Sequence, residues 1–373
     1  MQYFGVVVIC CVAFAGLCVE SYFTYSKPGA ARSVSIIAHR GSSGALPEHT
    51  VPAYERAAAD GAHYIECDLA LTRDLQLICR HESLLNSTTD VAKRAQFADR
   101  VTSRVVNGET LHGWFSVDFT LREIKQLRAV QRFDFRDKQY DGKFEIATFD
   151  EFIEVAKIHR VGVYPELKDV AWVNSLDIMP NDTRFEDLVL EQLNKHGYTF
   201  DDYKCCILQS FEESALLYLR ERTVVPLAML FKTNTTKADL QRYKDNGFFA
   251  VGVRKDLVTT YALAMNGSKP RIAGVTSLIT WCHELGLTVH VFTFRNEDRF
   301  ILCDYVQDPY LEYKHFVELG ADGLFTDFPG SLQRFLGRHC YLNGSNTLQL
   351  TDFKIFLAIV LLVPTAYFML NTW

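Results

Sequence analysis

Three acidic side chains have a spacing that suits the binding of a hard divalent cation. Glu66 and Asp68 lie two residues apart in an apolar run, so on a strand both carboxylates would project from one face while Cys67 faces the other. Glu166 ends a later run of the same kind. Three carboxylates without an imidazole or thiolate among them would bind Mg²⁺ or Ca²⁺ through oxygen. One divalent cation at these residues is therefore predicted; salt bridges that close the end of a barrel are the alternative.

Two histidines, His39 and His81, each follow an apolar run. The next residue is charged in both cases, Arg40 and Glu82. Imidazoles on both sides of a cation suit a displacement in which one removes a proton from the nucleophile and the other gives a proton to the leaving oxygen. Arg40 and Lys168 could neutralise phosphoryl oxygens, the charge that must be stabilised when a phosphodiester is cleaved.

Other polar residues lie at predicted strand ends and are candidates for substrate contact or for support of the site: Glu82, Gln209, Arg295 and Asp327. The chain has no Gly-rich phosphate loop and no Gly-x-Ser-x-Gly sequence, so nucleotide kinase and serine hydrolase chemistry lack support. Its formal net charge is −6, so we expect no binding of nucleic acid.

The elements that must position these side chains alternate between short apolar runs and amphipathic stretches from about residue 32 to 338. Nine runs are predicted strands: 34–38, 63–68, 75–80, 161–166, 205–209, 224–230, 249–253, 287–293 and 322–326. The run 75–80 follows its predecessor too soon for a parallel crossover, so it must return antiparallel as a hairpin arm. Eight parallel strands remain, which predicts an α/β fold, a closed (β/α)8 barrel of the TIM type.

Seven amphipathic stretches are predicted helices: 51–60, 149–159, 185–196, 213–221, 238–246, 271–284 and 311–319. The segment 82–145 breaks the alternation, because it is charge-rich and has helical periodicity only around 121–130. It is predicted to be a small subdomain inserted after the second strand hairpin, over one mouth of the barrel. Function in such a barrel lies at the C-terminal ends of the strands, where the candidate residues gather.

Both ends of the chain carry apolar segments outside the predicted barrel. Residues 1–18 are predicted to be a signal peptide with cleavage after Cys18; an uncleaved membrane anchor is the alternative. Residues 347–373 contain an apolar run preceded by small residues and a polar spacer, an order typical of a glycolipid (GPI) attachment signal, with a single transmembrane helix as the alternative. We therefore expect a secretory route and attachment to the extracellular face of the cell membrane.

The sequons and cysteines agree with an oxidising, secretory compartment. Five Asn-x-Ser/Thr sites occur, at Asn86, Asn181, Asn234, Asn266 and Asn343. Cys67 and Cys79 lie nearly symmetrically about the turn 72–74, so they could form a disulfide across the hairpin, although a slip of one residue in register would separate them. The adjacent Cys205 and Cys206 would alternate faces of a strand and would not share a zinc ion.

Several motifs occur in an order that resembles the glycerophosphodiester phosphodiesterase family, most closely its longer, bacterial periplasmic-type members. They are His39-Arg40-Gly41, Leu46-Pro47-Glu48-His49-Thr50, Tyr64-Ile65-Glu66-Cys67-Asp68-Leu69, His81 with Thr88-Thr89-Asp90, Tyr164-Pro165-Glu166-Leu167-Lys168, and Gly323-Leu324-Phe325-Thr326-Asp327-Phe328-Pro329. The match runs from about residue 34 to 338. It implies a TIM barrel with an inserted subdomain and metal-dependent hydrolysis of glycerophosphodiesters, such as glycerophosphocholine, to glycerol 3-phosphate and an alcohol.

Carried over by position, the resemblance implies His39 and His81 as the acid/base pair, Arg40 and Lys168 as phosphate contacts, and Ca²⁺ or Mg²⁺ bound by Glu66, Asp68 and Glu166. One position departs from the family pattern, since Glu82 follows His81 where the family usually has Asp. We expect the longer carboxylate still to orient His81.

Two other functions remain open. A phospholipase D-like lyase acting on sphingomyelin or lysophospholipids resembles the same barrel and metal triad, but such lyases look shorter where this chain has residues 82–145. A catalytically inactive surface binding protein would have lost one of the acidic or histidine positions, and all five are present.

Overall fold

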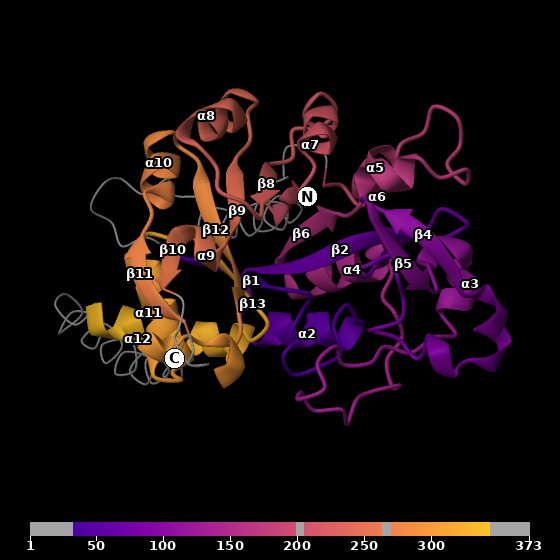
Figure 1. The fold of residues 1–373 in the computed structure, drawn as a ribbon, viewed down its shortest axis with the longest axis horizontal. Helices are drawn as coiled ribbons and strands as arrows, with labels where there is room; N and C mark the ends of the chain where they lie inside the picture. Colours follow the sequence, from indigo (N-terminus) through magenta and orange to yellow (C-terminus); the bar gives the residue numbers. More distant parts are fainter. Residues whose placement is uncertain (1–32, 199–204, 263–269, 344–373) are drawn as a thin grey trace, which may run out of the picture.

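Eight parallel strands close into a barrel in the computed structural model, which describes residues 33–198, 205–262 and 270–343, without the side chains of 338–343 (Figure 1). Around the barrel they run β1 (Ser35–Ala38), β2 (Tyr64–Leu71), β6 (Gly162–Leu167), β7 (Leu208–Ser210), β8 (Leu227–Phe231), β9 (Ala250–Arg254), β12 (Thr288–Phe294) and β13 (Gly323–Thr326). The barrel closes because β1 pairs in parallel with both β13 and β2. The predicted fold class is thus confirmed.

The antiparallel hairpin arm is also confirmed. Strand β3 (Leu77–Cys79) pairs with the end of β2, with Leu69 opposite Cys79. Cys67 and Cys79 form a disulfide in this hairpin, with 5.7 Å between their Cα atoms. Both sulfurs lie in the core between barrel and helices, on the face of β2 opposite to Glu66 and Asp68, as the alternation of a strand requires. The hairpin therefore brings His81, two residues after Cys79, to the end of β2.

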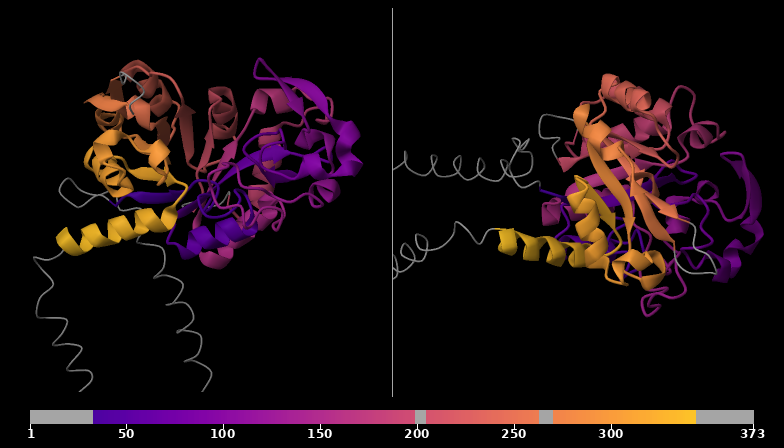
Figure 2. Two further views of the ribbon diagram at one scale, coloured as in Figure 1. Left: turned by 60° about the horizontal axis from the view of Figure 1, so that its bottom comes forward. Right: turned by 60° about the vertical axis from the view of Figure 1, so that its left-hand side comes forward.

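Helices surround the barrel (Figure 2). They are α2 (Val51–Ala59), α4 (Phe149–His159), α5 (Val170–Asn174), α6 (Phe185–Lys195), α7 (Glu213–Arg220), α8 (Lys237–Asp245), α9 (Lys255–Val258), α10 (Leu278–Glu284), α11 (Pro309–Glu318) and α12 (Pro329–Asn343). Side chains fix several starts: Thr50 caps α2, and Thr148 with Glu151 forms a capping box on α4. Of the described helices outside residues 82–145, α5, α9 and α12 were not predicted.

The predicted helix 271–284 is wrong in its first half. Strand β11 (Arg271–Val275) pairs antiparallel with β10 (Thr259–Ala262), and only α10 is helical. In the sequence Ile272-Ala273-Gly274-Val275 the two β-branched residues favour a strand when a partner strand is available, and Gly274 disfavours a helix.

Residues 82–145 form an extension beside the barrel, on the side opposite to α10 and α12 (Figure 1). The extension contains β4 (Thr102–Val106), β5 (Glu109–Gly113), α3 (Leu121–Ile124) and three short 3₁₀ helices. Its buried side chains form a small core with two residues of the β2–β3 hairpin and with the adjacent Ile146: Ala70, Ile78, Leu85, Val91, Phe97, Phe119, Ile124, Leu127 and Ile146. The helical periodicity predicted over 121–130 ends at Ile124, because the backbone of Arg128 bonds to Asp90 instead.

The barrel interior beneath the strand ends is filled by side chains. Its buried apolar residues are Ile37, Tyr64, Tyr164, Ile207, Ala228, Ala250 and Phe325. The hydroxyl of Tyr164 lies 2.8 Å from Nδ1 of His290 within this layer. Polar side chains that bind a ligand are thus confined to the mouth of the barrel.

Several sequence-based expectations fall outside the described residues. The predicted signal peptide, the C-terminal apolar segment and Asn266 lie there. Within the described part, no helix has the length and apolar character needed to cross a bilayer. The sequon residues Asn86, Asn181 and Asn234 are exposed.

Candidate active site

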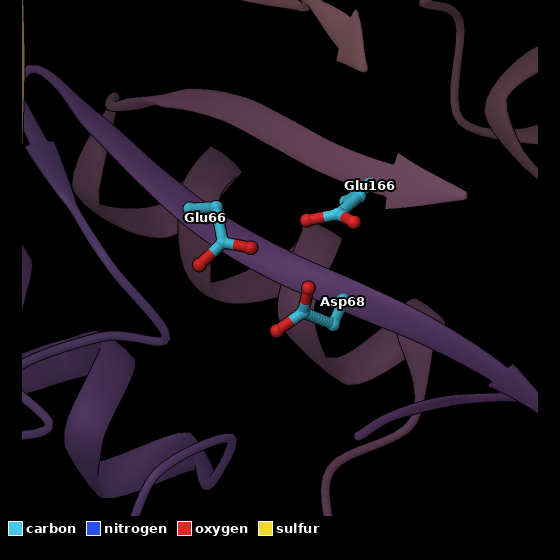
Figure 3. A group of neighbouring side chains, drawn as sticks. All are labelled: Glu66, Asp68 and Glu166. Atoms are coloured by element: carbon cyan, nitrogen blue, oxygen red, sulfur yellow. The ribbon is translucent and has the colours of Figure 1, made fainter. Parts of the chain in front are cut away.

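The three predicted acidic residues meet at the mouth of the barrel. Strand β2 provides Glu66 and Asp68, and the parallel register of β2 and β6 sets Asp68 beside Glu166. All three are buried, and one oxygen of each lies within 4.8 Å of the others. Figure 3 shows the three carboxylates turned toward one another. Their closeness follows from the two-residue spacing on β2 combined with the strand pairing.

Burial and mutual repulsion make it unfavourable for all three carboxylates to be ionised together without a further positive charge nearby. Burial raises the pKa of Glu66 well above its usual range, and the nearby Asp68 adds to this. Burial also raises the pKa of Glu166 to about 8, against the lowering effect of Lys168. For Asp68, burial is outweighed by His81, Lys168 and a hydrogen bond to His49, which hold its pKa well below the usual value. A divalent cation between the three groups would relieve the repulsion.

The protein orients one oxygen of each carboxylate. The backbone N–H of Arg40 donates to Oε2 of Glu66 at 2.6 Å, and Nε2 of His49 lies 2.9 Å from Oδ2 of Asp68. The ammonium of Lys168 lies 2.9 Å from Oε1 of Glu166. This set of buried oxygen donors fits one hard divalent ion with positions left for substrate.

Each of the two predicted histidines is held by a carboxylate through Nδ1. His39 lies 2.6 Å from Oδ1 of Asp327, and His81 lies 2.6 Å from Oε1 of Glu82. An ionised carboxylate can only accept, so in the neutral imidazole Nδ1 carries the hydrogen and Nε2 holds the lone pair. Glu82 thus reaches His81 in spite of its extra methylene.

The surroundings favour neutral imidazoles in the absence of substrate. Burial lowers the pKa of His39 to about 4, helped by the charge of Arg40. Burial also lowers the pKa of His81 to about 3, together with Arg40 and Lys168. Both rings can therefore accept a proton at Nε2 at neutral pH.

The two predicted phosphate contacts flank the acidic residues. The guanidinium of Arg40 lies 3.3 Å from Oδ2 of Asp68 and bonds to Glu48 at 3.2 and 3.3 Å. The ammonium of Lys168 lies 3.4 Å from Nε2 of His81. Both cations line the same cavity as the histidines, so they can meet an anionic group placed there.

The other predicted residues divide into two groups. Gln209 lines the cavity, and its buried Oε1 has no hydrogen-bond partner among the residues that the structure describes. Glu82 and Asp327 orient the histidines, and Arg295 donates to Oδ2 of Asp327 at 2.8 Å. Gln209 is therefore placed to contact a bound molecule, whereas the other three support the site.

Sequence reasoning missed part of the site. His49 was quoted within a motif but not as a partner of Asp68. Arg132 and Arg136, from the inserted segment, bond to Glu82 and Asp327 across 50 and 191 residues of sequence. No local pattern marks such contacts.

The cavity between these groups has a volume of about 130 Å³. Across from the acidic residues its wall is formed by Phe211, Leu230, Lys232, Phe292, Thr293 and Phe325. The ammonium of Lys232 lies 4.3 Å from the centre of the Phe211 ring. The cavity thus joins a highly charged side to a largely apolar one that carries a single lysine.

Comparison with known proteins gives a consistent result. The sequence profile of the glycerophosphoryl diester phosphodiesterase family matches residues 39–331. A glycerophosphodiester phosphodiesterase of Arabidopsis thaliana is 40% identical over 321 residues, which cover 80% of this chain and 85% of that protein. One from Haemophilus influenzae is 30% identical over 347 residues, covering 81% and 89%. Plant and bacterial forms are thus both among the relatives.

A solved structure shares the fold. It is a phosphodiesterase of Oleispira antarctica in complex with the product sn-glycerol-3-phosphate, with a TM-score of 0.57 and 20% identity. The similarity covers 81% of this chain and 96% of that one.

Proposed function

The chain belongs to the glycerophosphoryl diester phosphodiesterase family, and we propose that it cleaves its substrate with one divalent cation and the imidazoles of His39 and His81. It is a glycerophosphodiester phosphodiesterase. One observation carries the proposed mechanism. Glu66, Glu166 and the two carboxylate-anchored histidines line a single cavity at the mouth of the barrel, and an oxygen of the buried Asp68 lies within 4.8 Å of oxygens of both glutamates.

Glu66, Asp68 and Glu166 would hold the cation. When bound, a divalent ion withdraws charge from a phosphoryl oxygen and helps to orient the diester. Both Ca²⁺ and Mg²⁺ suit a set of three carboxylates, since each prefers oxygen ligands. The raised pKa values of Glu66 and Glu166 support this role, because a bound cation would supply the positive charge that stabilises both carboxylates in their ionised form.

The histidines move the protons. One imidazole accepts a proton at Nε2 from a water molecule that attacks the phosphorus, and the other donates a proton from Nε2 to the leaving alcohol oxygen, so the bond from phosphorus to the alcohol breaks as the bond to the water oxygen forms. The donor must first be protonated, which the negative charge of the bound phosphate favours. Asp327 and Glu82 keep each ring in the tautomer and orientation that these steps need.

Arg40 and Lys168 stabilise the phosphoryl charge that develops during cleavage. Both are held beside the cavity by ion pairs with carboxylates, so little reorganisation is needed when substrate binds. The unpartnered Oε1 of Gln209 accepts a hydrogen bond from a glycerol hydroxyl. The products are sn-glycerol 3-phosphate and an alcohol, in keeping with the product bound by the Oleispira antarctica enzyme.

Replacement of each histidine tests the mechanism. We expect His39→Ala and His81→Ala each to lower kcat for glycerophosphocholine by about 10²- to 10⁴-fold, the usual contribution of general acid or base catalysis. Release of glycerol 3-phosphate, measured with Ca²⁺ or Mg²⁺ present, gives the rate. His283→Ala, a histidine whose Nε2 lies 2.9 Å from Asp322 away from the cavity, is the matched control. Unchanged turnover in both site variants would remove the proposed mechanism.

A panel of substrates tests the substrate class. We expect glycerol 3-phosphate from glycerophosphocholine, and no cyclic phosphate from sphingomyelin or lysophosphatidylcholine. Faster cleavage of the intact lipids would show that the chain acts as a phospholipase D-like lyase.

We further propose that the enzyme acts on the extracellular face of the cell membrane. The disulfide between Cys67 and Cys79 and the exposed sequons Asn181 and Asn234 support an oxidising secretory route. Loss of mass on glycosidase treatment and release of the protein from intact cells by a phospholipase specific for glycolipid anchors are the expected results. An unglycosylated protein inside the cell would contradict the proposal.

A further inference from the structure

One short segment of the insertion contacts the carboxylate partners of both histidines. In this segment, residues 131–136, Arg132 donates from Nη1 and Nη2 to the two oxygens of Glu82, both at 2.8 Å. Four residues later, Arg136 donates from Nη2 to Oδ2 of Asp327 at 2.6 Å. The other oxygen of Asp327, Oδ1, bonds to Nδ1 of His39. In Glu82, Oε1 bonds both to Arg132 and to Nδ1 of His81. The insertion thus contacts both imidazoles indirectly, each through the carboxylate to which the imidazole is bonded.

We propose that Arg132 and Arg136 are positioning residues for turnover, because they fix the carboxylates that orient His81 and His39. The inference rests on the proposed roles of these two histidines. The insertion is thus part of the catalytic apparatus, although it lies beside the barrel.

Arg132 is the centre of a ladder of alternating charges. Besides Glu82, it binds Glu48 through Nε and Nη2, both at 2.7 Å. Glu48 in turn binds Arg40, whose guanidinium lies beside Asp68. The planar guanidinium can bind two carboxylates in fixed directions, which the ammonium of a lysine cannot do. The ladder therefore links the orientation of His81 to that of a predicted phosphate contact.

Glu82 depends on this link for its geometry. Its side chain is 33% exposed and has three rotatable bonds, so the bond to Nδ1 of His81 alone would leave it free to turn. Burial acts to raise the pKa of Glu82, but hydrogen bonds from His81 and Arg132 hold it well below its usual value. Within the described part of the chain, Arg132 is the one arginine or lysine that bonds to Glu82.

Arg136 shares its task with a second cation. Arg295 donates to the same oxygen of Asp327 at 2.8 Å, so Asp327 keeps a positive neighbour if Arg136 is removed. Arg136 is also packed over the rings of Phe133 and Phe328 and donates to the carbonyl of Ser43 at 3.0 Å. We therefore expect a smaller catalytic loss at Arg136 than at Arg132.

The segment is seated on the loop that follows β1, close to His39. The side-chain amide of Gln131 donates to the carbonyls of Ser43 and Leu46 at 3.1 and 3.3 Å. Its backbone N–H donates to Asp141 at 2.7 Å. These bonds hold the two arginines in place without the histidines, so the segment can orient the site rather than follow it.

Kinetics of single variants give the first test. We expect Arg132→Met to lower kcat for glycerophosphocholine by about 10- to 100-fold, the usual cost of losing such a supporting contact, with KM changed less than about threefold. Arg132→Lys keeps the positive charge but loses the planar guanidinium that binds two carboxylates, so its kcat should lie between those of the wild-type enzyme and Arg132→Met. Guanidinium ion should restore part of the activity of Arg132→Met. The matched control is Arg128→Met in the same insertion, because among the described residues the Arg128 side chain bonds to the backbone carbonyls of Lys125 and Leu127 and to Glu145, and this variant should keep full activity.

A double-mutant cycle separates positioning from mere support of the fold. If Arg132 acts through Glu82, the variant Glu82→Gln/Arg132→Met should be no more than about threefold slower than Glu82→Gln alone. The inference would be overturned if the loss of kcat in the double variant equalled the product of the losses in the two single variants, or if Arg132→Met had a normal kcat. Thermal melting of each variant reports on folding, and Arg132→Lys carries the test if Arg132→Met does not fold.

The outcome also distinguishes this inference from the mechanism beneath it. Full activity in His39→Ala and His81→Ala would remove the proposed function. Loss of activity in those variants, with normal kcat in Arg132→Met, would remove only the inference about the segment.

Discussion

At the scale of single residues, the charge balance of the three carboxylates governs both stability and function. Glu166 has its pKa raised to about 8 by burial, above the value of about 4.5 expected when unfolded. A carboxylate with a raised pKa gives its full stability below the unfolded value and loses it as the pH rises through the folded value. Glu166 should therefore lower the stability of the cation-free protein as the pH rises from about 4.5 to 8, while the lowered pKa values of His39 and His81 act in the opposite direction up to about pH 6.5, so the Glu166 effect is read between about pH 6.5 and pH 8.

Thermal melting in the presence of a chelator checks this prediction. Between about pH 6.5 and pH 8 the melting temperature of the wild-type protein should fall relative to that of Glu166→Gln, and Ca²⁺ or Mg²⁺ should restore it at pH 8 by binding the folded state. Glu166→Gln should show a smaller dependence on both pH and cation. A wild-type protein that melts equally at pH 6.5 and pH 8 without cation, and does not respond to one, would contradict the assignment.

Lys232 is predicted to influence the choice of head group. It lines the cavity over Phe211, and within the described residues it forms no ion pair with a carboxylate. A free ammonium attracts an anionic head group and repels the trimethylammonium of choline, by about 1 kcal/mol for one pair of charges about 4 Å apart in water. Lys232→Met should therefore raise KM about fivefold for glycerophosphoserine and leave KM for glycerophosphocholine equal or lower. Parallel kinetics on the two diesters measure this, with Lys237→Met as the control, and equal changes on both would refute it.

A residue of the site can be predicted from the sequence when its role follows from its near neighbours in the chain, and not when it depends on a partner far away in the sequence. The acidic residues, histidines and cations at the strand ends were found because alternation and strand order are local properties. Arg132 and Arg136 were missed because their partners lie 50 or more residues away. The role of His49 was missed because a histidine in a loop gives no sign of the carboxylate that it meets.

At the scale of elements, the hairpin of β2 and β3 connects the disulfide to the site. The bond joins residues 12 apart and lies two residues before His81. Closing a loop of this size restricts the unfolded chain and stabilises the fold by about 3 kcal/mol in the chain-entropy account. It also ties the end of β3 to β2.

Replacing both cysteines tests this link. Cys67→Ser/Cys79→Ser should lower the melting temperature and lower kcat more than it raises KM, because the backbone that leads to His81 is less restrained. Wild-type protein treated with a reducing agent should show the same lower melting temperature and lower kcat. Cys282→Ala, at a buried cysteine outside the hairpin, keeps the disulfide and should respond to the reductant as the wild-type protein does. A double variant with normal melting and kcat would show that the disulfide does not support the site.

The elements were predicted well where one pattern dominates. The strands of the barrel are apolar runs between turn residues, and their order follows from the alternation with helices. The error at 271–284 arose because helical spacing of apolar residues continued across Gly274, and only pairing with β10 decides in favour of a strand. The same holds for 125–130, where pairing with the segment 88–90 replaces the helix.

At the scale of the whole molecule, the cavity lies where the closed barrel meets the insertion. The barrel supplies the acidic residues and the histidines, while residues 131–136 hold their carboxylate partners. A rigid barrel with a small additional core at its mouth explains how five groups from distant parts of the sequence keep one geometry. The central claim is that this geometry exists to hold a divalent cation within reach of two imidazoles.

The most direct test is the release of glycerol 3-phosphate from glycerophosphocholine by protein freed of metal with a chelator, before and after Ca²⁺ or Mg²⁺ is added back. The wild-type enzyme should be inactive without cation and recover fully with one of the two, whereas Asp68→Asn should recover less than about a hundredth of that rate, since one ligand is lost. Full activity of the metal-free wild-type enzyme, or full recovery by Asp68→Asn, would contradict the claim.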